Sequence, residues 1–159
     1  MSTDIRQKGE GFMEFTLAQL KEKFTELFGN DGEPKLYFAP GRVNLIGEHT
    51  DYNLGFVLPG AIDKAIYVGV KPNDGQKCRI HSVDYDQSIE MDLHGEKPAQ
   101  QWARYIYGVV QEMEKRGALI RPFDMTFGGD VPLGAGLSSS AALESAVGFA
   151  LYRLFFVFF

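Results

Sequence analysis

The sequence lacks the features that mark many secreted, metal-binding and membrane proteins. Its one cysteine, Cys78, excludes an internal disulfide and fits a reducing compartment. The longest apolar run, residues 146–159, is interrupted by Arg153 and falls short of the roughly 20 residues that a membrane-spanning helix needs. The N-terminus is charged and has no apolar core of a signal peptide. We therefore expect a cytoplasmic protein with no membrane partner.

An excess of basic charge is also missing. The sequence has 16 Lys and Arg residues and 21 Asp and Glu residues, so the net charge is −5 at pH 7. Proteins that bind nucleic acids carry basic stripes, and none is visible here, so we expect no nucleic-acid partner. The 159 residues, 45% of them hydrophobic, suffice for one domain with a core of its own.

A stretch of small residues, from Val131 to Leu143, is the most informative part of the chain. Gly134 and Gly136 allow a tight turn and leave the backbone open to a ligand. The three serines at 138–140 suit the N-cap and first turn of a helix that starts at Ala141. Because the first amides of a helix have no internal partner, this pattern indicates a cradle for an anion, with phosphate as the best match. A flexible Gly/Ser linker is the alternative.

Two common nucleotide motifs are absent from this stretch. A Walker A loop needs a Gly-Lys-Ser/Thr sequence after its glycines, and no lysine follows here. The spacing also differs from the Gly-x-Gly-x-x-Gly fingerprint of dinucleotide-binding proteins. If the cradle binds a nucleotide, the positive charge near its terminal phosphate must therefore come from elsewhere in the chain.

A second polar stretch, residues 41–53, contains a fixed cation, Arg42, followed by Glu48, His49 and Asp51. Carboxylates accept two or more hydrogen bonds each, so they suit a ligand rich in hydroxyl groups. The cluster is consistent with a sugar-binding site, and a solvated acidic turn is the alternative. A metal site is the weaker interpretation, because no second histidine or cysteine lies nearby.

The periodicity of the apolar residues predicts helices and strands in the order typical of an α+β domain. We expect a mainly antiparallel sheet with the helices packed on one face. Trp102 lies on the apolar stripe of a predicted helix, where it forms part of the core or borders a nucleotide. The predicted helices are Phe15–Phe28, Gln100–Arg116 and Ala141–Leu154, and the predicted strands are Lys35–Ala39, Phe56–Ile62, Ala65–Val70, Cys78–Val83, Ser88–Leu93 and Phe123–Gly128.

Both polar stretches resemble a known family. Gly41-Arg-Val-Asn-Leu-Ile-Gly-Glu-His-Thr-Asp-Tyr52 is similar to the galactokinase signature. Pro132-Leu-Gly-Ala-Gly-Leu-Ser-Ser-Ser-Ala-Ala-Leu143 is similar to the phosphate-binding motif of the GHMP small-molecule kinases. The resemblance covers roughly residues 15–148, with N-acetylgalactosamine kinase as the nearest rival, and it implies the fold of a GHMP kinase N-terminal domain.

The resemblance implies transfer of the γ-phosphoryl group of ATP to the anomeric hydroxyl of galactose, with Mg²⁺ as the metal. Carried over by motif, the roles fall into three groups. Arg42 would stabilise the transferred phosphoryl group. The sugar would be held by Glu48, His49, Thr50 and Asp51. The phosphates would be bound by Gly134, Ala135, Gly136, Leu137, Ser138, Ser139 and Ser140, with Ser140 also on Mg²⁺, and the adenine would lie near Trp102 and Ser82.

One departure from the family affects activity. Family members are considerably longer, and their catalytic aspartate and acidic Mg²⁺ ligand follow the Gly-Ser motif. We therefore expect a flexible N-terminus (1–14), an incomplete kinase domain (15–159), a missing C-terminal part as the partner, and no turnover by this chain alone. A non-catalytic galactose- or ATP-binding sensor and an N-acetylgalactosamine kinase remain the alternatives. The terminal residues 154–159 are apolar on every side, which predicts a surface prone to association.

Overall fold

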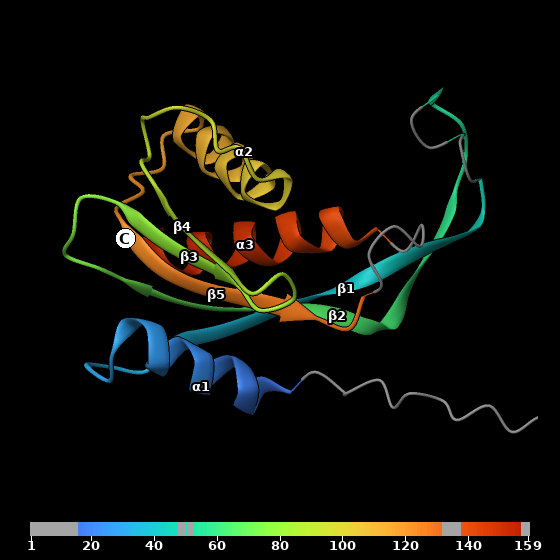
Figure 1. The fold of residues 1–159 in the computed structure, drawn as a ribbon. Coiled ribbons are helices and arrows are strands. Elements are labelled where there is room, and N and C mark those ends of the chain that lie inside the picture. The colour runs from blue at the N-terminus through green and yellow to red at the C-terminus, as the bar shows by residue number, and fades with distance from the viewer. Residues whose placement is uncertain (1–15, 48–49, 51–52, 132–137, 157–159) are drawn as a thin grey trace, which may run out of the picture.

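The domain is built on one five-stranded sheet, as the computed structural model shows for residues 16–47, 50, 53–131 and 138–156 (Figure 1). The strand order is β1-β2-β5-β3-β4, and all neighbours are antiparallel except β3 and β5. This confirms the α+β class and the mainly antiparallel sheet. The strands are β1 (Lys35–Ile46), β2 (Leu58–Pro72), β3 (Cys78–Ser82), β4 (Gln87–Met91) and β5 (Phe123–Gly129), and the helices are α1 (Leu17–Phe28), α2 (Gln101–Lys115) and α3 (Ser139–Phe155).

Helices cover both faces of the sheet. Helix α3 packs on β1 and β2, with α2 against α3, and this layer encloses the main core. Helix α1 lies on the opposite face, where Leu20 and Phe24 are fully buried over β2 and β5. The prediction that the helices share one face therefore holds for α2 and α3 and is wrong for α1.

The first strand is longer than predicted. It was expected to end at Ala39, but it continues through Pro40 and Gly41 to Ile46. Strand β1 forms one edge of the sheet, where a proline can be accommodated because half of the backbone amides point away from a neighbour. A register shift between Pro40 and Arg42 absorbs the irregularity, and Asp63-Lys64, which was predicted to separate two strands, lies inside β2 opposite this shift.

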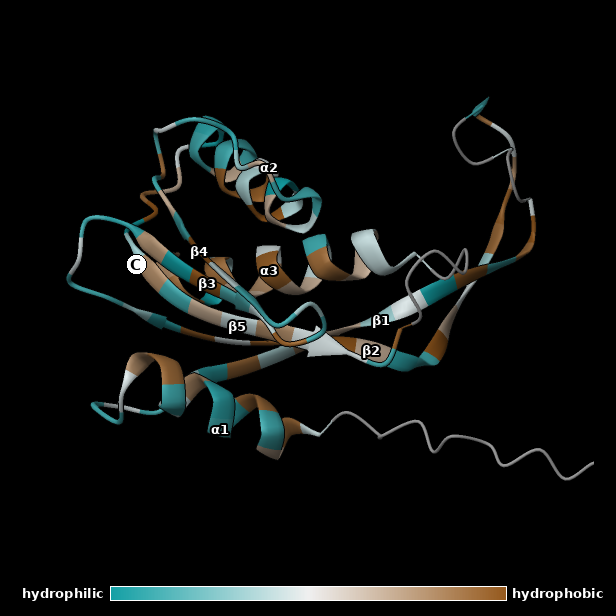
Figure 2. Ribbon diagram, in the orientation of Figure 1, coloured by the Kyte–Doolittle hydropathy of each residue, from teal (hydrophilic) through white to brown (hydrophobic). Residues whose placement is uncertain are grey.

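The outer ends of β1 and β2 form a two-stranded arm, residues 42–46 and 58–61, that extends beyond the helices (Figure 1). Much of the arm is hydrophobic in Figure 2, and Leu45, Ile46 and Leu58 are exposed on it. Leu54 and Phe56, in the connection at its tip, are fully exposed. The arm therefore presents apolar surface that no described part of the chain covers.

The C-terminal end of α3 is better covered than its sequence predicts. Leu154 and Phe155 pack against the main core, and the Phe155 ring lies 6.5 Å from that of Phe123. Phe156 remains partly exposed and stacks on Tyr152. The predicted association surface thus begins at Phe156, and residues 157–159 lie outside the described part, as do the N-terminal residues 1–15.

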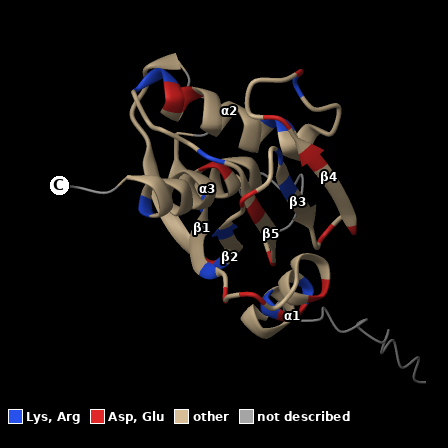
Figure 3. Ribbon diagram, turned by 90° about the vertical axis from the view of Figure 1, so that its left-hand side faces the viewer, with Lys and Arg blue, Asp and Glu red and all other residues tan. Residues whose placement is uncertain are grey.

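Basic and acidic residues are interspersed on the side of the molecule that Figure 3 presents. None of the described helices combines the length and the hydrophobicity that crossing a membrane requires.

Candidate functional site

The first turn of α3 begins at the serines that the sequence marks as an anion cradle. The helix starts at Ser139, two residues earlier than predicted, and Ser138 is its N-cap in a left-handed conformation (φ 58°, ψ 42°). No hydrogen bond from the Ser138 side chain caps the helix, so its hydroxyl does not occupy the first-turn amides. Uncapped amides at the positive end of a helix can receive an anion. The preceding positions, Gly134, Ala135, Gly136 and Leu137, lie outside the described residues.

A pocket of about 220 Å³ lies beside this helix end and brings Ser139 and Ser140 together with Trp102. The three residues were predicted to act on one nucleotide, and the fold places them around one cavity although they come from different helices. The remaining lining residues include apolar side chains from the sheet and from α3, and polar ones from the β3–β4 turn and the start of α2: Ile66, Phe127, Leu143, Asp84, Tyr85, Gln101 and Tyr105.

Trp102 belongs both to the core and to this pocket. Only 6% of its surface is exposed, its ring lies 5.3 Å from that of Phe127, and its Nε1 donates a hydrogen bond to Gln87 Oε1 at 3.4 Å. The two interpretations of Trp102 are therefore compatible. The buried ring forms a fixed wall of the pocket, held by the sheet, and is not a free surface on which a ligand could stack on both sides.

Ser82 does not line the pocket. It is fully buried in β3, where its backbone neighbours are Phe127 of β5 and Gln87 of β4, the two residues that contact Trp102. Its hydroxyl has no hydrogen-bond partner within the described part of the chain. The predicted role of Ser82 near adenine stays a prediction.

Measured along the direction of strand β1, Arg42 and the start of α3 lie at about the same position. The ring of Tyr37 in β1 contacts the ring of Phe149 in α3, with 5.6 Å between the centroids. From that contact, β1 and α3 run in opposite directions (Figure 1). Arg42 is about 17 Å further along β1, at the usual strand rise, and Ser139 is about 15 Å back along α3, at the usual helix rise. The half-buried Arg42 and the anion cradle therefore occupy the same end of the domain.

The loop at the tip of the arm is shaped by Thr50 and Gly47. The Thr50 hydroxyl lies 2.8 Å from the carbonyl oxygen of Gly47 and 3.2 Å from that of Phe56. The Gly55 amide donates to the Thr50 carbonyl oxygen at 2.8 Å. Thr50, predicted to hold the sugar, thus links the backbone of Gly47 to that of Gly55 and Phe56. Glu48, His49 and Asp51 themselves lie outside the described residues.

Gly47 permits this turn through its backbone conformation. Its φ of 101° is one that side-chain-bearing residues rarely adopt, and a Cβ added there would lie 2.5 Å from the Phe56 carbonyl oxygen.

Asp84 is a functional candidate that the sequence analysis missed. It lines the pocket from the β3–β4 turn, and its Oδ1 accepts a hydrogen bond from the Gly129 amide at 3.3 Å. Burial raises the pKa of the Asp84 carboxyl group, and the bond from Gly129 opposes this shift. Asp84 itself remains exposed, and it borders the pocket only because α2 and α3 approach its turn.

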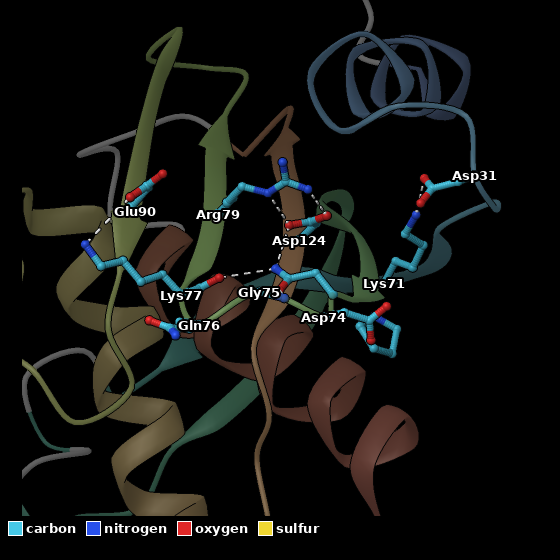
Figure 4. A pocket seen from close by; sticks show the side chains of 11 residues that line it. Asp31, Lys71, Asp74, Gly75, Gln76, Lys77, Arg79, Glu90 and Asp124 are labelled. Atoms are coloured by element: carbon cyan, nitrogen blue, oxygen red, sulfur yellow. Dashed lines mark hydrogen bonds and ion pairs between the residues drawn. The ribbon is translucent and has the colours of Figure 1, made fainter.

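A larger cavity of about 560 Å³ lies on the α1 side of the sheet and is lined mainly by charged side chains (Figure 4). All of these charges except that of Asp74 are paired with one another. Arg79 binds Asp124 through two hydrogen bonds, and Lys71 binds Asp31 at 2.8 Å. Because its three cations are each paired with a carboxylate, we assign this cavity a structural role.

The described residues offer little for metal or thiol chemistry. No three His, Cys, Asp or Glu side chains among them converge where a metal ion could be held. The Ser140 hydroxyl fits the predicted role as one Mg²⁺ ligand, because it lines the pocket at the helix end, but further ligands are needed. Burial raises the pKa of the Cys78 thiol to about 12, so its sulfur is unreactive at neutral pH.

Comparisons with known proteins bear on the family and the fold. Residues 22–72 match the galactokinase galactose-binding signature, and residues 104–157 match the N-terminal domain of the GHMP kinases. The structure is similar to that of Lactococcus lactis galactokinase complexed with galactose, with 38% identity and a TM-score of 0.81 over 87% of this chain. The chain spans only 37% of that galactokinase.

More distant structures share the fold. Methanococcus jannaschii mevalonate kinase has 18% identity and a TM-score of 0.66, over 78% of this chain and 41% of its own. A D-glycero-D-manno-heptose 1-phosphate kinase from Bacteriodes thetaiotaomicron has 21% identity and a TM-score of 0.64, over 74% and 40%.

Proposed function

Because the chain belongs to the GHMP kinase family and carries the galactokinase galactose-binding signature, we propose that the protein phosphorylates galactose. The reaction transfers the γ-phosphoryl group of ATP to the anomeric hydroxyl of the sugar, which gives galactose 1-phosphate and ADP. The observation that carries the proposal is the position of Arg42 and the anion cradle at one end of the sheet. A phosphoryl donor bound at the cradle would face the strand that leads into the sugar signature.

The described residues would contribute positioning and charge. The first-turn amides of α3, with Ser139 and Ser140, would hold phosphate oxygens, as helix N-termini commonly do. The guanidinium of Arg42 would lie near the transferred group and stabilise the charge that spreads over its oxygens. This cation would supply the positive charge that a Walker A lysine provides elsewhere. Mg²⁺, when bound, would neutralise phosphate charge, with the Ser140 hydroxyl as one ligand.

The sugar would be held at the tip of the arm. In the proposed site Glu48, His49 and Asp51 bind its hydroxyl groups, since carboxylates accept hydrogen bonds from neutral hydroxyls. The hydrogen bonds of Thr50 to the backbone of Gly47 and Phe56 would fix the loop that carries these three residues. Thr50 therefore has a positioning role in the proposal, and its hydroxyl is not required to contact the sugar.

A further part of the whole protein would complete the site. The chain spans 37% of the galactokinase that it resembles, and the exposed Leu54 and Phe56 lie beside the sugar signature. Burying such apolar side chains against another domain is favourable. We propose that the remaining part of the protein packs against the arm, supplies the catalytic base and closes the sugar site. Residues 1–159 alone would then bind ligands in a trough open to water, where electrostatic stabilisation is weak.

The test is galactose-dependent release of ADP by the whole protein and by residues 1–159. We expect turnover in the usual enzyme range, about 1 s⁻¹ or more, from the whole protein, and far less from residues 1–159. Faster turnover of N-acetylgalactosamine than of galactose would assign the amino sugar as substrate. Galactose binding in calorimetry without ADP release would make the protein a sensor and overturn the proposal.

A further inference from the structure

The end of strand β5 is joined to β2 by the side chain of Asp130. The regular ladder between the two strands ends at the pair of Ile66 and Gly129. Asp130, the next residue, donates its backbone amide to the Ala65 carbonyl oxygen at 3.2 Å and accepts the Ala65 amide on its Oδ1 at 2.8 Å. A carboxylate oxygen thus takes the place of the backbone carbonyl that one more strand residue would offer. Ala65 is buried, so its amide needs this partner.

The residues on either side of Asp130 are also held in place. A Cβ added at Gly129 would overlap the Ala65 carbonyl oxygen, so the two strands approach closely where the ladder ends. Val131, which follows Asp130, is only 4% exposed and belongs to the main core. The direction in which the chain leaves β5 is therefore fixed by a close backbone contact, two hydrogen bonds and a buried side chain.

On its other side, β2 meets the strand that carries Arg42, and it does so across an irregular step. Ala65 is paired with Pro40 of β1, and the next pair is Arg42 with Ala61. Between these pairs β1 advances by two residues and β2 by four, so β2 bulges. Regular pairing alone does not fix the position of Arg42 at such a step. The two hydrogen bonds of Asp130 hold the Ala65 end of the bulge.

The same part of β2 lies next to the start of α3. Ile66, which follows Ala65, lines one pocket together with Ser139 and Ser140. A shift of β2 at Ala65 would therefore change its fit against the first turn of this helix as well as the position of the bulge. One hydrogen-bonded contact thus stands between the two parts of the proposed phosphoryl site.

We propose that Asp130 is a positioning residue for phosphoryl transfer, because it fixes Arg42 relative to the first turn of α3. This step rests on the proposed function. The role needs an acceptor oxygen at the right place and does not need the negative charge. Oδ2 of Asp130 lies 3.7 Å from Lys64 Nζ, and the Lys64 side chain is 45% exposed. Exposed ion pairs of this kind contribute little.

The experiment measures kcat and KM of the whole protein for four substitutions. Asp130→Ala removes the acceptor, and a small misplacement of reacting groups can cost about 10²-fold in rate, so we expect kcat to fall by about that factor with the KM for galactose nearly unchanged. Asp130→Asn keeps an acceptor oxygen in place and should retain kcat within about threefold. Asp130→Glu keeps the charge but moves the oxygens by one methylene, and it should lose about tenfold or more. Lys64→Gln, the matched control, removes the ion pair and should leave kcat unchanged.

A double-substitution cycle distinguishes positioning from a general loss of structure. If Asp130 acts by aligning Arg42, Asp130→Ala should cost about threefold or less in a protein that already carries Arg42→Ala, because no guanidinium is left to align. A purely structural role would give the same loss in both backgrounds. Asp124→Asn is the stability control, since it removes a buried carboxylate on the α1 side and should leave kcat intact well below its Tm.

Three results would overturn the proposal for Asp130 alone, with galactose phosphorylation by the original protein intact. They are an unchanged kcat in Asp130→Ala, equal losses in the two backgrounds, and an Asp130→Asn variant that is less active than Asp130→Glu. The last comparison decides the question even if Asp130→Ala does not fold. Absence of galactose-dependent ADP release by the original whole protein is a different result, which would overturn the proposed function and the role of Asp130 together.

Discussion

The substitution Asp124→Asn tests how the layers of the domain are joined on the α1 side. Only 1% of the Asp124 side chain is exposed. Its carboxylate accepts hydrogen bonds from Arg79 Nε at 2.7 Å, from Arg79 Nη2 at 2.5 Å and from Asn73 Nδ2 at 2.8 Å (Figure 4). The Arg79 guanidinium also lies 5.0 Å from the centre of the Phe28 ring. One carboxylate thus connects β5, β3, the β2–β3 turn and, through Arg79, helix α1.

The expected loss of stability depends on which residue of the Asp124–Arg79 ion pair is buried. Asparagine keeps the shape of Asp124 but turns one acceptor into a donor that faces the Arg79 guanidinium. Breaking a fully buried ion pair destabilises a protein by about 3–5 kcal/mol. The Arg79 side chain is 44% exposed, so water can solvate its charge in the variant, and we expect a loss of about 2 kcal/mol. For a chain of this size that corresponds to a fall in Tm of about 4–8 °C.

Urea unfolding, followed by Trp102 emission and by far-UV circular dichroism, measures this loss. The matched control is Asp31→Asn, which removes a carboxylate from the same cavity. Asp31 is highly exposed and pairs with Lys71 at the surface, so its loss should fall close to the error of the measurement. If the two variants lose the same small amount, the buried carboxylate does not hold these layers together and the reasoning fails.

Three further predictions concern the arm, the pH response and the reaction. Gly47→Ala should sharply weaken galactose binding by the whole protein, because its Cβ would collide with the Phe56 carbonyl. Gly60→Ala is the control, since an added Cβ there meets nothing within 4 Å, and it should leave binding unchanged. Equal galactose binding by the two variants would contradict this prediction. Burial lowers the pKa of His81 below its ordinary value of 6.5, so its contribution to stability should be present above pH 6.5 and fall as the pH decreases below it. Thermal unfolding from pH 7.5 to pH 5 should show a smaller decline for His81→Gln, and unchanged pH dependence would count against it. Arg42→Ala in the whole protein should lower kcat by about 10³-fold with little change in galactose affinity, whereas an intact kcat would remove Arg42 from the mechanism.

The helices and most strands could be predicted from periodicity, and the reason is local. The apolar residues of α1 and α2 repeat every three or four positions, so the predicted helices lie within two residues of the observed ones. The helix that follows the serines was predicted to start at Ala141 and starts at Ser139, because the first turn can form without a side-chain cap. Capping residues in a sequence indicate that a helix begins nearby, but they do not identify its first residue exactly.

The errors arose where tertiary structure decides. Pro40 and Gly41 normally end a strand, but at the edge of a sheet they only shift its register. An amphipathic stripe shows that α1 packs on something, and it does not show which face of the sheet it covers. Asp84 was missed for the same reason, since its neighbours in the pocket are Trp102 of α2 and Ser139 of α3, which are distant in sequence.

The order of elements explains why two motifs from opposite parts of the chain can serve one reaction. Strand β1, which leads into the sugar signature, is an edge strand, and α3, which begins at the anion cradle, crosses back over β1 and β2 in the opposite direction. The start of α3 therefore lies level with the part of β1 that carries Arg42. The β3–β4 turn and α2, together with β2 and β5, line a pocket beside the start of α3 that includes Asp84 and Trp102. In the proposed enzyme three separate segments thus hold the reactants: the arm holds the sugar, the start of α3 holds the phosphates, and the pocket beside it holds the base. A substitution in one segment should then affect one part of the reaction, galactose binding for Gly47→Ala and phosphoryl transfer for Arg42→Ala.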